Sequence, residues 1–210
     1  MQKAFILLLL LSSALARGSD EPTILVFGDS LSAGYGMEVD QSWATLLQQR
    51  LELEGYEHRV INASITGETT QGGAARIDAA VERFKPALLI IELGGNDGLR
   101  GLPTDRMYEN LRTIVASGRA AGAEVVLLGI RIPLNYGPRY SRAFEAVFRD
   151  LAENENVAWV EFFMQGVALN DELMQADGIH PNVAAQAVLL ENAWPVISEA
   201  IAAPEQRAAE

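Results

Sequence analysis

Cysteine is absent from the 210 residues of this sequence, and histidine occurs only twice. The lack of cysteine excludes disulfides, thiol nucleophiles and cysteine-ligated metal sites. Hydrophobic residues make up 49% and charged residues 21%, which are ordinary values for a soluble globular protein. The length corresponds to one domain and is sufficient to bury a sizeable core.

Basic residues are also few relative to acidic ones. There are 16 basic residues against 28 acidic ones, which gives a formal net charge of −12. An acidic surface repels phosphate backbones, so we expect no nucleic-acid partner.

The sequence has a short apolar run near its start, from Ala4 to Leu11, preceded by Lys3. It is too short to span a bilayer as a helix, which needs about 20 residues. Small residues, Ala14 and Ala16, then occupy positions −3 and −1 of a cut after Ala16, which is typical of a secretory signal peptide. We therefore expect residues 1–16 to be removed and the protein to be periplasmic or secreted. A retained, anchoring N-terminus is the alternative, although the absence of cysteine excludes a lipoprotein anchor.

The rest of the chain, residues 17–210, reads as a single domain in which Val-, Ile- and Leu-rich runs alternate with amphipathic stretches. The runs show little internal alternation, as expected for parallel strands covered on both faces. This order predicts an α/β fold of three layers, with a five-stranded, mostly parallel, doubly wound sheet and right-handed crossovers. Strands are expected at Thr23–Gly28, Arg59–Ala63, Ala87–Leu93, Glu124–Ile130 and Val157–Glu161. Helices are expected at Trp43–Glu54, Gln71–Phe84, Asp105–Ala121, Ser141–Asn154 and Val183–Ala202.

Several helix ends carry their own predictions. Thr104 is a candidate N-cap and Gly122 a candidate terminator of the third helix. Pro195 is expected to kink or break the last helix, because proline has no N–H to donate.

Four polar blocks follow predicted strands. They span residues 28–36, 62–70, 94–98 and 177–181. Open sheets of this type bind ligands beyond the carboxyl ends of their strands. We therefore expect the four blocks to converge on one edge of the sheet.

One block contains a histidine, and another contains a serine that can be its partner. His180 lies at the expected edge, whereas His58 precedes the second strand and therefore lies at the opposite edge. Asp177 can orient one imidazole nitrogen while the other faces Ser30. The alternative is structural: Asp177 and Pro181 form a capping turn before the last helix, and Ser30 is a turn or N-cap residue.

An acyl-transfer site also needs donors aimed at a developing oxyanion. The candidates are the backbone N–H groups of Ser30 and Gly67 and the side-chain amide of Asn96. The alternative for the block around Asn96 is a sharp turn with no further role. Asp29 has no acidic or lysine partner at the spacing of a metal or phosphoryl site, so we read it as structural, holding the turn, and expect no metal.

These blocks resemble those of the SGNH hydrolases, also called GDSL esterases and lipases. The family's Ser, Gly, Asn and His match Ser30, Gly67, Asn96 and His180, and its Asp falls on Asp177. The resemblance covers nearly the whole mature chain. It implies a flavodoxin-like α/β/α sandwich and a Ser-His-Asp triad that works through an acyl-enzyme.

Residues 95–101, 130–137 and 177–182 are most similar to the bacterial acyl-CoA thioesterase I, arylesterase and lysophospholipase group. The resemblance implies a small, monomeric, cofactor-free enzyme without a stable membrane anchor. Its implied substrates are small-molecule acyl esters and thioesters, including aryl esters, acyl-CoA thioesters and lysophospholipids.

Other functions fit the sequence less well. It lacks the Gly-x-Ser-x-Gly nucleophile elbow, the Gly-x-Gly-x-x-Gly dinucleotide pattern and the phosphate-loop lysine pattern. A non-catalytic acyl- or sugar-binding module would have no need of a nucleophile, base and oxyanion donors together. A carbohydrate O-deacetylase uses the same triad, but sugar sites favour exposed aromatics, and Trp43, Trp159 and Trp194 fall in predicted helices and a strand.

Two loops at the active edge, residues 98–103 and 131–138, carry apolar side chains that suggest an acyl-chain groove. Arg100 or Arg131 is expected at its polar rim. The alternative is that Leu102 and Leu134 fill the top of the core. The candidate pocket residues are Leu99, Arg100, Leu102, Arg131, Leu134 and Tyr136.

Overall fold

The computed structural model describes residues 21–209, except for the side chains of Leu134 and of residues 204–209. The expected signal peptide, residues 1–16, lies outside the described residues. Among the helices of residues 21–209, none combines the length and apolar character that crossing a bilayer requires.

Five strands form the central sheet, in the order β2-β1-β3-β4-β5. All neighbouring pairs are parallel, so the predicted doubly wound sheet is confirmed, and its order is that of flavodoxin-like folds. Every strand end lies within two residues of its expected position. The strands are β1 (Thr23–Gly28), β2 (Arg59–Asn62), β3 (Leu88–Glu92), β4 (Glu124–Leu128) and β5 (Ala158–Val160).

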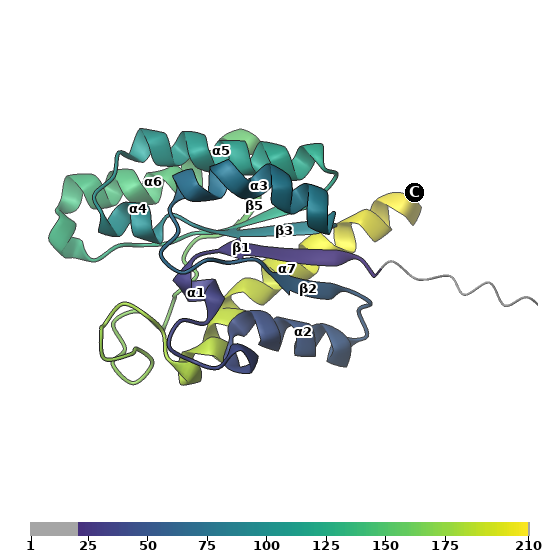
Figure 1. Cartoon of the computed structure of the whole chain (residues 1–210), viewed down its shortest axis with the longest axis horizontal. Coiled ribbons are helices and arrows are strands. Elements are labelled where there is room, and N and C mark those ends of the chain that lie inside the picture. The colour runs from purple at the N-terminus through teal and green to yellow at the C-terminus, as the bar shows by residue number, and fades with distance from the viewer. Residues whose placement is uncertain (1–20, 210) are drawn as a thin grey trace, which may run out of the picture.

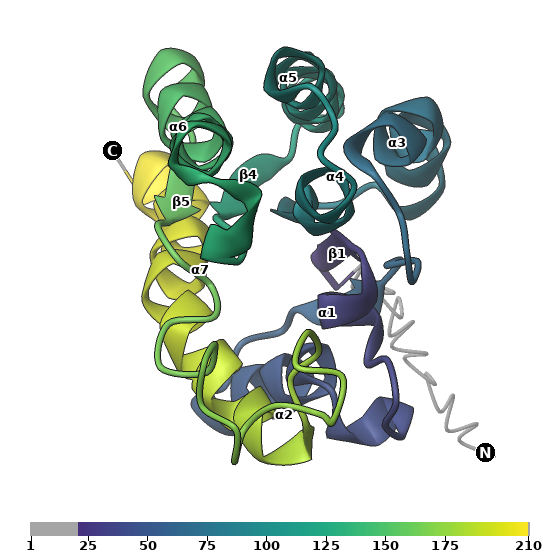
Figure 2. The ribbon, with the colours of Figure 1, turned by 90° about the vertical axis from the view of Figure 1, so that its left-hand side faces the viewer.

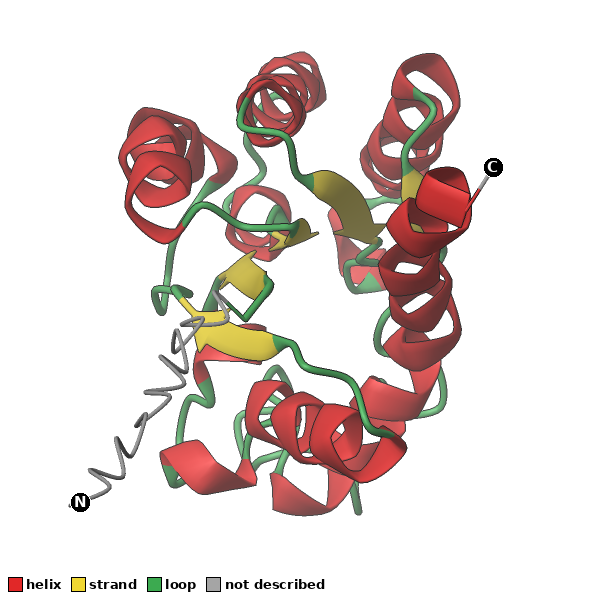
Figure 3. Ribbon diagram, turned by 90° about the vertical axis from the view of Figure 1, so that its right-hand side faces the viewer, coloured by secondary structure: helices red, strands yellow, loops and turns green. Residues whose placement is uncertain are grey.

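Helices cover both faces of the sheet and complete three layers (Figure 1). Helices α2 and α7 lie on one face, whereas α3, α5 and α6 lie on the other. Figure 3 views the molecule from the edge where the strands begin, with the C-terminal end of α7 near it. The α-helices are α1 (Ser30–Ala33), α2 (Trp43–Glu54), α3 (Thr70–Phe84), α4 (Gly95–Leu99), α5 (Thr104–Ala120), α6 (Pro138–Glu155) and α7 (Gln186–Ala209).

Strand β1 shows why its sequence lacks alternation. Ile24 and Val26 point into the core beneath α2 and α7, while Leu25 and Phe27 point into the core beneath α3, α5 and α6. All four side chains are fully buried. Since successive side chains of a strand face opposite sides, burial on both faces requires an apolar residue at each position.

The predicted N-cap at Thr104 is wrong, and the break considered at Pro195 is absent. Helix α5 begins at Thr104 itself, and Pro103 is its N-cap without a side-chain hydrogen bond. Helix α7 continues through Pro195 without a break. Trp194 and Ile197, on either side of this proline, are buried in the core, so packing holds the helix together where its hydrogen bonding is locally weakened.

The edge at the carboxyl ends of the strands carries the functional candidates. Figure 2 faces this edge and shows α1 and α4 close together near its centre, with the loop before α7 beside α1. Both short helices closely follow a strand: one residue separates α1 from β1, and two residues separate α4 from β3. The topology therefore gathers segments that lie far apart in the sequence.

Candidate active site

Ser30 is the first residue of α1 and follows β1 through Asp29. Asp29 is the N-cap of this short helix, since its Oδ1 accepts from the Leu31 backbone N–H at 3.0 Å. The turn is tightly packed, because a Cβ on Gly28 would lie 2.8 Å from the Glu92 Oε2 and 2.9 Å from the Ser32 Oγ. The end of β1, the close packing at Gly28 and the Asp29 cap together fix the backbone conformation at Ser30.

His180 and Asp177 form a short structure of their own before α7. His180 Nδ1 lies 2.7 Å from Asp177 Oδ2, and Asp177 Oδ1 accepts from the backbone N–H groups of His180 and Ile179 at 3.0 and 2.9 Å. The backbone hydrogen bond from His180 contributes most to lowering the pKa of Asp177 to about 2, followed by the bond from the imidazole. An ionised Asp177 requires a donor, so Nδ1 carries the proton and Nε2 keeps its lone pair.

The lone pair on Nε2 faces the serine. His180 Nε2 lies 3.0 Å from Ser30 Oγ, which completes a chain from Asp177 to Ser30. Asp177 also has part of the structural role considered for it, because the bond that its side chain accepts from the Ile179 N–H forms an Asx turn. The cap before α7, however, is Asn182, which accepts from the Ala185 N–H. One aspartate therefore shapes the turn and orients the imidazole.

Asn96 lies in the first turn of α4, beside the serine block. Its Nδ2 donates to Asp29 Oδ2 at 3.0 Å. Asp29 is 1% exposed, and burial raises the pKa of its carboxyl to about 6 against the opposing effect of its hydrogen bonds from Leu31 and Asn96. The structural role expected for Asp29 is present in the cap, and the contact with Asn96 is an addition that the sequence did not reveal.

Gly67 lies in the loop between β2 and α3 and has a φ of 79°, which L side chains rarely adopt. The Ile65 N–H donates to the Gly28 carbonyl at 3.0 Å, so this loop is joined to the serine block. Arg100 donates to the Gly67 carbonyl at 3.0 Å, which joins the loop to the end of α4. The structure thus links all four polar blocks to one another at the predicted edge.

The description "GDSL-like Lipase/Acylhydrolase family" belongs to a family model that matches residues 26–188. The chain belongs to this family. It is an enzyme that hydrolyses ester or thioester bonds, in agreement with the names of its relatives. Esterase TesA of Pseudomonas aeruginosa is 53% identical over 175 residues, which cover 83% of this chain and 87% of that protein.

Two further relatives support the same chemistry. The thioesterase 1/protease 1/lysophospholipase L1 of Escherichia coli is 43% identical over 175 residues, covering 83% of both proteins. A crystal structure of the psychrotrophic esterase EstA from Pseudoalteromonas sp., inhibited by monoethylphosphonate, has a TM-score of 0.81 to this GDSL-family chain. It is 43% identical and covers 84% of this chain and 97% of its own.

Several polar residues around the site of this GDSL-family hydrolase were not singled out from the sequence. Asp97 accepts from the Thr70 backbone N–H at 2.8 Å and from the Thr70 hydroxyl at 2.6 Å, and thereby fastens the Gly67 loop to α4. Arg76 forms an ion pair with Glu68, the neighbour of Gly67. No local sequence signal identifies these pairs, because their members lie on different elements.

Glu92 is a fully buried acid at the end of β3. Its Oε2 accepts from the Ser32 hydroxyl at 2.8 Å, and Ser32 in turn accepts from the Trp43 indole N–H at 3.2 Å. Burial, and secondarily the charge of Asp29, raises the pKa of Glu92 well above its ordinary value of 4.5. A glutamate in an otherwise apolar strand is a sequence signal that could have revealed this residue.

Tyr35 contributes an aromatic wall to the site. Its ring lies 4.3 Å from the His180 ring between centroids, tilted by 38°, and its side chain is half exposed. Gln175 fastens the two segments, since its side-chain amide donates to the Tyr35 carbonyl at 2.7 Å and its backbone N–H donates to the His180 carbonyl. His58, by contrast, precedes β2 at the opposite edge and has Tyr56 as a neighbour.

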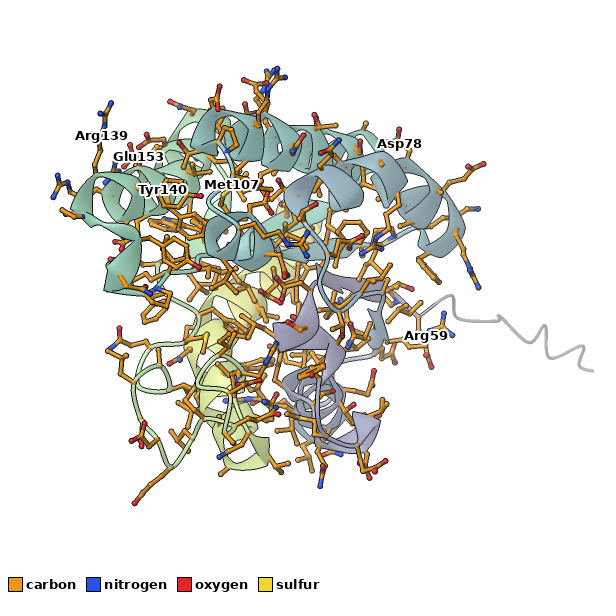
Figure 4. The ribbon with its side chains drawn as sticks, turned by 60° about the vertical axis from the view of Figure 1, so that its left-hand side comes forward. Arg59, Asp78, Met107, Arg139, Tyr140 and Glu153 are labelled. Atoms are coloured by element: carbon orange, nitrogen blue, oxygen red, sulfur yellow. The ribbon has the colours of Figure 1, made fainter. Side chains whose placement is uncertain are left out.

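The two candidate pocket loops meet beside α6. They line a hollow of about 630 Å³, to which Leu102 and Tyr136 contribute. Tyr136 donates to the Leu99 carbonyl and Tyr140 to the Leu102 carbonyl, each at 2.7 Å. The first loop is therefore bonded to the second loop through Tyr136 and to the first turn of α6 through Tyr140. Tyr140 points inward from the start of α6, whereas Arg139 projects outward (Figure 4). Leu102 is half-buried and lines the hollow.

The remaining pocket candidates are placed differently. Leu134 belongs to a 3₁₀ turn, Leu134–Tyr136, and its side chain lies outside the described part of the structure. Arg131 is not brought to this hollow, because its guanidinium pairs with Glu161 at 2.7 Å and lies over the Phe162 ring. Of the two arginines considered for the rim, Arg100 is therefore the one held near Gly67. Within residues 21–209, no group of three or more His, Asp or Glu side chains is arranged to hold a metal ion.

Proposed function

We propose that Ser30 is the nucleophile of this hydrolase, with His180 as general base and Asp177 as the residue that orients it. The observation that carries the proposal is the chain of contacts from Ser30 Oγ to His180 Nε2 at 3.0 Å and from His180 Nδ1 to Asp177 at 2.7 Å. A serine hydroxyl becomes an effective nucleophile when an adjacent base accepts its proton.

The reaction then proceeds in two halves. His180 takes the Ser30 proton while Oγ attacks the acyl carbon, and the carbonyl oxygen becomes an oxyanion. The backbone N–H groups of Ser30 and Gly67 and the Asn96 amide donate to that oxyanion. The C–O or C–S bond breaks as His180 returns the proton to the departing alcohol or thiol. Water, activated by His180, then releases the acid from the acyl-enzyme.

The proposed substrates are aryl esters, acyl-CoA thioesters and lysophospholipids, which share an acyl chain. The hollow at Leu102 and Tyr136 is a suitable place for that chain, with Leu99 and Leu134 on the same two loops. Arg100, exposed and bonded to the Gly67 carbonyl, is proposed at the polar end. Apolar contact along a groove favours longer chains without demanding one length.

A carbohydrate O-deacetylase is the less favoured alternative. Trp43 and Trp194 are buried in the core, and Trp159 is half-buried. The two buried tryptophans offer no open face on which a sugar ring can stack, and Trp159 offers at most part of one.

We further propose that residues 1–16 are a signal peptide, that residues 17–210 form a single domain, and that the mature protein is a monomer in the periplasm or medium. Size-exclusion chromatography with light scattering would show a mass near that of one chain. A stable dimer would contradict the proposed monomer without affecting the proposed chemistry.

The test of the catalytic proposal is hydrolysis of a p-nitrophenyl ester with and without a serine-directed organophosphate. We expect stoichiometric inactivation and one adduct, located on Ser30 by peptide mass spectrometry. An adduct on another serine, or full activity after labelling of Ser30, would refute the assignment.

A further inference from the structure

Asp29 lies between the nucleophile and a proposed oxyanion donor and contacts the segments of both. Its two carboxylate oxygens have separate partners: Oδ1 accepts from the Leu31 backbone N–H, and Oδ2 accepts from Asn96 Nδ2, each at 3.0 Å. At 1% exposure, Asp29 is too buried for water to replace either partner readily. The helix cap accounts for the bond made by Oδ1, whereas the bond from Asn96 to Oδ2 plays no part in the cap.

The chemistry of the amide gives that second bond a function. An asparagine side chain can present either its oxygen or its nitrogen in a given direction, and the two orientations differ little in shape. A carboxylate has no proton and can only accept, so it favours the orientation in which the nitrogen faces it. The nitrogen carries two hydrogens, and the one that does not bond to Asp29 remains available for a substrate oxygen.

We propose that Asp29 is a positioning residue for the oxyanion hole, because its carboxylate selects the Asn96 rotamer that donates to the oxyanion. This inference rests on the proposed role of Asn96 as an oxyanion donor. Asp29 itself does not touch the reacting atoms. One side chain, that of Asp29 next to Ser30, thereby both caps α1 and orients the proposed oxyanion donor.

Ionisation of Asp29 is therefore linked to the geometry of the site. Three titratable groups face it from different elements: Glu92 from β3, Asp97 from α4 and His180 from the loop before α7. Burial and, less strongly, Asp97 raise the pKa of Asp29, while a charged His180 lowers it, and the result is about 6. Burial, and secondarily the charge of Asp29, raises the pKa of Glu92 well above its ordinary value. Below pH 6 a protonated Asp29 can donate, so it no longer favours the nitrogen of Asn96.

The Asp29→Asn substitution tests the two roles of Asp29 separately, namely capping of α1 and selection of the Asn96 amide orientation. Asparagine is as good an N-cap as aspartate, so its oxygen can keep the bond from Leu31. Its NH₂ then faces Asn96 and favours the flipped amide, whose oxygen would point toward the oxyanion. We expect kcat/KM for a p-nitrophenyl ester to fall by roughly 10²–10³, as for loss of one oxyanion donor. In an Asn96→Ala background, the same substitution should cost less than about threefold, because the amide it positions is gone.

The pH dependence of kcat/KM distinguishes a positioning role of Asp29 from a purely structural one, which would not change the slope of the acid side. In the native enzyme, log kcat/KM should gain one extra unit of acid slope below pH 6, because protonation of Asp29 releases the Asn96 amide. This extra unit should be absent in Asp29→Asn and also in Asn96→Ala, which leaves Asp29 untouched. The second variant keeps the test decisive if the first fails to fold.

Glu92→Gln is the matched control, because Glu92 is equally buried beside Asp29 but does not contact Asn96. Glutamine imitates the neutral acid, so we expect near-native kcat/KM and an unchanged acid slope. Fully multiplicative losses in the double variant, near-native activity of Asp29→Asn, or an unchanged slope in Asn96→Ala would each overturn the inference. Near-native activity of Asn96→Ala alone would instead remove Asn96 from the proposed function, and the inference with it.

Discussion

His180 Nε2 lies 3.0 Å from Ser30 Oγ, although 150 positions separate the two residues in the chain. The serine comes from the start of α1 and the histidine from the loop before α7, so the contact exists only in the folded sheet edge. If the two are base and nucleophile, as proposed, they act as one unit.

Removal of either member of this pair should abolish most of the activity. We expect Ser30→Ala and His180→Ala each to lower kcat by several orders of magnitude, and the double variant to be hardly worse than either. Steady-state kinetics on a p-nitrophenyl ester measure this, with circular dichroism to verify folding. Folded Ser30→Ala with near-native turnover would exclude Ser30 as nucleophile.

The orienting role proposed for Asp177 predicts a severe effect from a nearly isosteric change. Asp177→Asn can donate to His180 Nδ1 and so stabilise the tautomer whose Nε2 carries a proton and cannot act as base. We expect kcat to fall by roughly 10⁴. Glu172→Gln, on the same loop, is a control that should retain native kcat, since the two described hydrogen bonds from this residue to the side chains of Asn170 and Asn182 use its backbone N–H and carbonyl. A loss of less than about tenfold in Asp177→Asn would contradict the tautomer argument.

The proposed acyl groove predicts a dependence on chain length. Each methylene held against apolar side chains adds up to about 0.8 kcal/mol, so kcat/KM should rise by at most threefold to fourfold per carbon before it levels off. Leu102→Ala and Leu134→Ala should flatten this slope while nearly sparing acetyl esters.

A series of p-nitrophenyl esters of increasing chain length measures that slope. Leu53→Ala, an exposed leucine on α2, is the control and should leave it unchanged. A uniform loss at every length in Leu102→Ala would assign this leucine to the fold and not to substrate selection.

The buried carboxyl of Asp29 also predicts the pH dependence of stability. Its pKa is raised from 3.8 to about 6 on folding, so between these values the folded state holds a proton that the unfolded state has lost. The free energy of unfolding should therefore decrease as pH rises from 4 to 6, with a contribution from Asp29 on the order of 3 kcal/mol. Asp29→Asn should remove this contribution and be more stable than the native protein at pH 7.

Urea unfolding at a series of pH values measures the effect. Asp177 acts in the opposite direction, because its pKa is lowered to about 2, and its stabilising effect is lost only as pH falls below 4. The two contributions therefore occupy different pH ranges. A native protein and an Asp29→Asn variant with parallel stability curves from pH 4 to 7 would show that the Asp29 carboxyl is not strained by burial.

The N-terminal pattern predicts export. Production in a secreting bacterial host should give a mature protein that starts at Arg17 or within a few residues of it. N-terminal sequencing of the exported material measures this, and recovery of intact Met1 would contradict it.

Much of the fold was predictable because its signals are local. The strands were located within two residues, since burial on both faces forces unbroken apolar runs such as Ile24–Phe27. The link between Asp177 and His180 was also predictable, because three residues of spacing place both on one turn. The N-cap prediction at Thr104 was wrong because α5 begins one residue earlier than expected. The break considered at Pro195 is absent because packing of its neighbours holds α7 together.

The sequence by itself determined which residues could do chemistry, and strand order brought them to one edge. The tertiary structure decided which polar groups pair across elements: Asp29 with Asn96, Thr70 with Asp97, and Arg100 with the Gly67 carbonyl. Residue type alone leaves each of these groups with many possible partners. The choice among them depends on distances of a few tenths of an ångström, which are set by the packing of strands and helices distant in sequence.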